Sequence, residues 1–184
     1  MKAFKLFYLL LLSGFFFFNS CYEQSFITLE SSSDGILHPV EIAIPVTVIK
    51  NENSTKNTCT GSIALNIENA LFHELTGYLM DVRNFQVKWV TIQVTGDAEG
   101  EIENLQLTVG TDNFTIPRFL LGNTYDGNDR KLIDLLQSVF DKVLPPVSAT
   151  LQLEISGETN VDTDTPLDYI LTIDYSITIP APLY

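Results

Sequence analysis

The chain has 184 residues, of which 45% are hydrophobic, and its 23 acidic and 10 basic side chains give a formal net charge of −13. An acidic excess of this size argues against nucleic acid as a partner, because nucleic acid phosphates are bound by Lys and Arg. It also argues against direct electrostatic docking onto anionic lipid.

The N-terminal segment has the composition of an export signal. Lys2 and Lys5 precede an apolar run from Leu6 to Phe18, which ends just before Asn19-Ser20-Cys21. A run of this length matches the hydrophobic region of a cleaved signal peptide, whereas a transmembrane helix needs about 20 apolar residues. We therefore predict a signal peptide over residues 1–20.

The residues around Cys21 resemble the lipobox of bacterial lipoproteins, in which a small residue directly precedes an acylated cysteine. Ser20 is the small residue, while Phe18 and Asn19 depart from the usual pattern. Relaxed boxes after phenylalanine-rich segments are similar to those of the Bacteroidetes. The resemblance covers only the first two dozen residues, and it implies lipid on Cys21 and an outer-membrane location, on the periplasmic or the cell-surface face. More than one acyl chain gives lasting attachment to a bilayer.

The two cysteines leave two alternatives open. If Cys21 carries lipid, Cys59 is a lone thiol that packs as a small apolar side chain. If Cys21 is not lipidated, the two could form one disulfide in an oxidising compartment. In either case, removal of residues 1–20 leaves 8 basic and 23 acidic residues, a net charge of −15, on a chain long enough for one core.

The mature chain is expected to begin with a tether. Residues 21–35 hold the lipidated Cys and a serine-rich stretch without periodicity, which is typical of a flexible linker. Residues 36–184 are predicted to form a single β-rich globular domain. In its general sequence pattern this domain resembles uncharacterised lipoprotein domains of the Bacteroidetes.

Alternation and helical spacing locate the elements of the first half of the domain. Alternating apolar residues predict strands over 41–48 and 63–67, with a polar loop at 50–61 between them. Spacings of three and four residues predict an amphipathic helix over 69–82. Residues 85–109 read as a hairpin, and a change of parity in its first strand predicts a bulge near Trp89.

The second half contains the clearest helical pattern. After a short apolar piece over 114–121, the apolar residues of 129–143 cover one arc of a helix, which Pro145 and Pro146 end. Two alternating strands over 147–155 and 169–179 are then expected to pair as a hairpin. The predicted class is α+β: mainly antiparallel β, as a sandwich-like or curled sheet, with two amphipathic helices.

Few residues are candidates for chemistry. Trp89 and Tyr125 are possible ligand contacts, because aromatic rings can line a sugar- or peptide-binding face. Two acidic loops offer oxygen ligands for a weakly bound cation, although turn formation and helix capping explain the same side chains: Asp126, Asn128, Asp129, Glu158, Asp162 and Asp164. The only histidines are His38 and His73, and no nucleophile elbow, P-loop or paired-cysteine motif occurs. We therefore expect no catalytic residue, no cofactor and no metal.

Three roles fit these features. The first is a non-catalytic binding or accessory subunit that holds a protein partner of the cell envelope near the outer membrane. The second is a carrier of apolar ligands such as lipids, which needs a hollow interior of several hundred Å³. The third is a carboxylate-based hydrolase of envelope polymers, which needs two facing acids about 5–9.5 Å apart. We prefer the first, because the sequence has a membrane tether and no catalytic motif.

Overall fold

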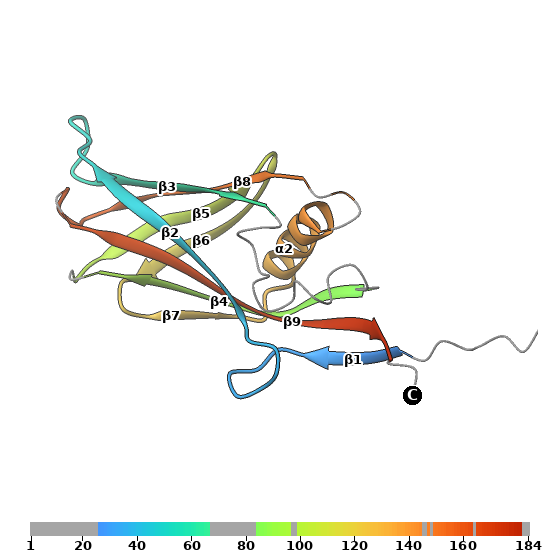
Figure 1. Cartoon of the computed structure of the whole chain (residues 1–184). Helices are drawn as coiled ribbons and strands as arrows, with labels where there is room; N and C mark the ends of the chain where they lie inside the picture. Colours follow the sequence, from blue (N-terminus) through green and yellow to red (C-terminus); the bar gives the residue numbers. More distant parts are fainter. Residues whose placement is uncertain are drawn as a thin grey trace, which may run out of the picture.

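The computed structural model describes residues 26–66, 84–96, 99–144, 147, 149–163 and 165–181. These residues form nine strands and a helix, in the following order along the chain (Figure 1): β1 (Phe26–Glu30), β2 (Val40–Ile49), β3 (Asn57–Leu65), β4 (Asn84–Thr95), β5 (Glu101–Val109), β6 (Asp112–Leu120), β7 (Thr124–Gly127), α2 (Arg130–Val143), β8 (Leu151–Thr159) and β9 (Leu167–Pro180). None of the helical residues described belongs to a segment long and apolar enough to cross a membrane.

All nine strands belong to one antiparallel sheet, so the mainly antiparallel β part of the predicted class is confirmed. The strand order is β6-β5-β8-β3-β2-β9-β4-β7, and β1 pairs with the C-terminal half of β9. The two end strands, β6 and β7, are consecutive in the chain. The short connection between them donates two hydrogen bonds. Leu121 N–H donates to the oxygen of Gly100, which directly precedes β5 (2.9 Å), and Gly122 N–H donates to the oxygen of Val94 in β4 (3.4 Å). The sheet therefore curls into a nearly closed barrel.

Alternation along each strand produces the core. In β2, Ile42, Ile44, Val46 and Val48 are buried and the residues between them are exposed, as predicted. In β9 the alternation runs along the strand with one exception, Ser176, which is also buried, so that one row of side chains faces the interior of the barrel. That row consists of Leu167, Tyr169, Leu171, Ile173, Tyr175, Ile177 and Ile179.

Helix α2 lies in the opening of the curled sheet, where the strands on its two sides diverge (Figure 1). The predicted boundaries of 129–143 are confirmed within one residue: Asp129 is the N-cap, and its carboxylate accepts the Lys131 N–H at 2.8 Å. The helix packs on β4 and β6 with its apolar face, namely Leu132, Leu135, Leu136, Val139, Phe140 and Val143. The other predicted helix, over 69–82, lies outside the described residues.

Gln137 of α2 bonds to the edge of β4 that the short strand β7 leaves open. β7 pairs only with Val90–Gln93. In the part of β4 that precedes this paired segment, Val87 N–H donates to Gln137 Oε1 at 2.8 Å. Gln137 Nε2 in turn donates to the Phe85 oxygen at 2.9 Å and to Asp141 Oδ1 at 2.8 Å. The side-chain amide thus satisfies two backbone groups that a neighbouring strand would otherwise bind.

We expect Gln137→Met to lower the free energy of unfolding by about 1–3 kcal/mol, because it keeps the side-chain length but leaves both backbone groups without a protein partner. Urea unfolding of the purified protein measures the change. Ser138→Ala, on the next residue of the same helix, is the control and is expected to stay within about 0.5 kcal/mol of the parent. Equal stability of the two variants would contradict this role for Gln137.

The strand pairing differs from prediction in two places. The predicted hairpin over 85–109 is wrong, because β4 pairs with β9 and β7, while β5 pairs with β6 and β8. The predicted hairpin of the last two strands is also wrong, because the β2–β3 hairpin lies between β8 and β9. The alternating pattern correctly predicts which residues are buried, but it does not identify which strands are neighbours.

Local features along the strands are partly as predicted. The bulge near Trp89 is confirmed as a register shift between Val87 and Trp89. The polar loop is shorter than predicted, because β3 already begins at Asn57. The tether prediction is wrong for Phe26–Glu30, which form β1 on β9, while 21–25 lie outside the described residues.

Candidate binding groove

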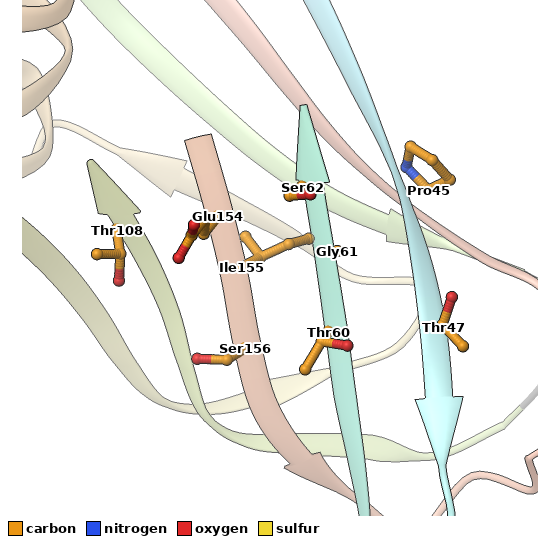
Figure 2. A pocket seen from close by; sticks show the side chains of 9 residues that line it. All are labelled: Pro45, Thr47, Thr60, Gly61, Ser62, Thr108, Glu154, Ile155 and Ser156. Atoms are coloured by element: carbon orange, nitrogen blue, oxygen red, sulfur yellow. The ribbon is translucent and has the colours of Figure 1, made fainter. Parts of the chain in front are cut away.

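A hollow lies on the outer face of the barrel, across β2, β3, β8 and β5 (Figure 2). We call it the outer groove. It has a volume of about 530 Å³, within the range usual for ligand sites. Its lining residues are Pro45, Thr47, Thr60, Gly61, Ser62, Thr108, Glu154, Ile155 and Ser156.

The polar side chains of the outer groove form two rows that run across the strands. In one row, Thr60 of β3 is paired with Thr47 of β2 and with Ser156 of β8. In the other row, Glu154 of β8 is paired with Ser62 of β3 and Thr108 of β5. Figure 2 shows both rows side by side. Because each strand turns its apolar residues inward, these hydroxyl groups face solvent together.

Gly61 lies between the two rows, at the point where β2 and β3 stop pairing. The last pair of that ladder is Val46 with Gly61. A Cβ atom on Gly61 would lie 2.5 Å from the Pro45 carbonyl oxygen and 3.2 Å from Ile155 Cγ1. Glycine therefore permits the close approach of the two backbones here. Beyond it the strands separate, and the short hydroxyl side chains leave the surface hollow.

The charge around the outer groove is mainly negative. Glu154 is the one ionisable side chain among the nine described residues that line it. Further along β5 and β8, Glu103 is paired with Glu158, and Lys56 contacts Glu103. The hydrogen bond to Glu103 raises the pKa of Lys56, and the nearby carboxylates add to this effect. Lys56 and Arg118, which bonds Glu101, thus face three carboxylates at this rim. With Glu154 the acids remain in excess, which favours neutral or cationic ligands.

The two aromatic candidates lie on opposite faces of the sheet and outside the groove. Trp89 is half-buried on the outer face, and its Nε1–H donates to Asp126 Oδ1 at 2.6 Å. Tyr125 faces inward opposite Ile92, with its ring 6.0 Å from that of Phe114. Burial raises the pKa of Tyr125, and the adjacent Asp129 raises it further. The structure therefore does not bring the two rings together at one site.

The predicted cation ligands are likewise dispersed. Asp126 accepts from Trp89, Asp129 caps α2, and Glu158 belongs to the acidic rim of the groove. Asn128 is exposed, and Asp162 lies in an exposed turn closed by a hydrogen bond from the Thr165 N–H to its backbone oxygen. Asp164, like Cys21, lies outside the described residues. The part of the chain that the structure describes contains no group of three or more potential metal ligands.

The barrel interior beneath the outer groove is densely packed. Cys59 is a free thiol at 2% exposure, and burial raises its pKa to about 11, so it is protonated at neutral pH. A small void there admits no water-sized sphere, and is lined by Val46, Cys59, Val94, Ile102, Leu105, Ile155, Ser156 and Tyr169. This part of the interior has no room for an apolar ligand.

Sequence reasoning missed the outer groove because its residues come from four separate segments. The available signal was that Thr and Ser recur at solvent-facing positions of these strands, among them Thr47, Thr60 and Ser156. That pattern identifies a site only once the strand order and register are known. No family model, no curated protein and no solved structure matches this chain.

Proposed function

We propose that this protein is a membrane-anchored, non-catalytic binding subunit of the cell envelope, tethered through lipid on Cys21, which holds a protein partner in the outer groove. The observation that carries the proposal is the pair of cross-strand rows, made of five hydroxyl side chains and Glu154, in a hollow of about 530 Å³. Hydroxyl groups both donate and accept hydrogen bonds, so the groove suits the amide groups of an exposed loop or extended segment. Glu154 and the acidic rim favour a segment that contains Lys or Arg.

The position of the groove relative to the anchor supports this role. Val46, beside the groove, is paired with Leu167 at the start of β9, whereas Phe26, near the lipidated N-terminus, is paired with Pro180 at its end. Strands rise about 3.3 Å per residue, so these two ends of β9 are roughly 40 Å apart. Figure 1 accordingly places β1 and the β2–β3 turn at opposite ends of the molecule. An anchor at residue 21 therefore presents the groove away from the bilayer.

Site-specific photo-crosslinking in the native membrane tests this proposal. A benzophenone amino acid at Thr60 is expected to give a discrete adduct with a partner protein. The matched control is Thr172, which is also half-buried on the outer face, in β9, and is expected to give none. Adducts at both positions, or at neither, would contradict the proposal.

A charge reversal in the groove provides an independent check. We expect Glu154→Lys to lower the yield of the Thr60 adduct about tenfold, because it places a cation where a basic partner would bind. Glu41→Lys makes the same change of charge on an exposed outward position of β2 outside the groove lining, and is expected to leave the adduct unchanged. Equal effects of both variants would indicate a general charge effect instead of a specific site.

A further inference from the structure

We propose that the Phe26 end of β1 rests on the bilayer surface and orients the domain on it; this inference relies on the proposed anchoring at Cys21. Two large apolar side chains are exposed at this end, Phe26 at 48% and Ile27 at 39%. β1 pairs only with β9, and its other edge has no partner among the described strands. This part of the sheet therefore presents apolar surface that the described domain does not cover.

Because the connection to Cys21 is short, the bilayer is the expected partner of this apolar surface. Only residues 22–25 separate Cys21 from Phe26. A chain extends by at most about 3.6 Å per residue, so Phe26 stays within roughly 18 Å of the lipidated residue. The headgroup region on one side of a membrane is roughly 5–8 Å deep, so Phe26 can reach that region without full extension of the connection. A lipidated Cys21 thus keeps Phe26 close to the lipid surface at all times.

The chemistry of this end indicates an apolar contact. Residues 26–49 contain no Lys or Arg, and Glu30 at the end of β1 and Asp34 after it are exposed. Residues 26–49 therefore offer no cation that would attract anionic headgroups, and the contact is expected to be insensitive to salt. The backbone groups on the edge of β1 that has no partner among the described strands are disfavoured in hydrocarbon. The Phe26 ring therefore reaches the boundary between headgroups and acyl chains, while the strand remains outside it.

Fluorescence quenching in vesicles tests the contact on the mature, lipidated protein. Thr28→Cys, exposed two residues from Phe26, carries an NBD dye, and Thr47→Cys on the exposed face of β2 is the matched control. The native Cys59 is buried and does not compete for the dye. In phosphatidylcholine vesicles that contain nitroxide lipids, we expect quenching at position 28 to be at least threefold stronger than at position 47, stronger with shallow than with deep nitroxides, and unchanged in 1 M NaCl. Adding Phe26→Ser is expected to reduce quenching at position 28 at least twofold.

The outcomes separate this inference from the anchoring that it relies on. Co-flotation with the vesicles and the intact mass report acylation of Cys21. If the protein floats and carries lipid but positions 28 and 47 are quenched equally, the contact is refuted while the anchor stands. If the protein carries no lipid and does not float, the anchor fails and the contact fails with it. Quenching that disappears at high salt would also overturn the contact, since it would show that charge brings this end to the bilayer.

Discussion

Phe140→Ala is expected to lower the free energy of unfolding by about 3–5 kcal/mol, the cost typical of removing a buried aromatic ring. Phe140 has 0% exposure and lies in the last turn of α2. Its ring lies 4.8 Å from that of Phe85, which in turn stacks on Tyr175 at 5.0 Å. These three rings join the helix to β4 and β9. The truncation therefore leaves a cavity where α2 fills the opening of the curled sheet.

The loss is a large part of the stability expected for a domain of this size, which is about 5–15 kcal/mol. At about 2–4 °C per kcal/mol, the melting temperature should fall by roughly 10 °C. Phe140→Leu keeps most of the volume and should cost less than the alanine variant. Arg130→Ala, which removes an exposed side chain from the same helix, should change stability by no more than about 0.5 kcal/mol. If Phe140→Ala melted with the parent, α2 would not be part of the cooperative core.

Inward and outward positions could be predicted from the sequence because they depend on local period alone. The alternation in β2 and β9 and the helical arc of α2 are each read from neighbouring residues. The same reasoning located the bulge in β4, because a single inserted residue reverses the parity of everything after it. In each case the sequence pattern and the structural feature that it predicts lie within one segment of the chain.

Strand partners could not be predicted in the same way. β8 and β9 are consecutive, yet the β2–β3 hairpin separates them in the sheet. A strand presents the same backbone donors and acceptors to any partner, so its sequence does not say which one it will meet. The outer groove depends on this missing information, because Thr47, Thr60 and Ser156 become neighbours only through two ladders. β1 was missed for a different reason: five residues beside a run of serines are too few for alternation to be recognised.

Cys21→Ser is expected to move the protein from the membrane fraction to the soluble fraction. The serine hydroxyl cannot replace the cysteine sulfur as the site of lipid attachment, and each acyl chain contributes about 0.8 kcal/mol per buried methylene. The half-exposed Phe26 and Ile27 cannot compensate, since burying even a whole apolar side chain contributes only about 1.5–3 kcal/mol.

Fractionation together with intact mass measures this change. Ser20→Ala, which keeps a small residue before the cysteine, is the control and is expected to remain acylated and membrane-bound. The released Cys21→Ser protein should keep the parent's unfolding curve, because residue 21 precedes every strand that the structure describes. Cys21→Ser protein that still sediments with membranes at unchanged yield, and resists a high-salt wash, would refute the lipid anchor. Since the acidic surface offers no electrostatic alternative, that result would require attachment through a bound partner, and the outer groove would then be the first place to look for it.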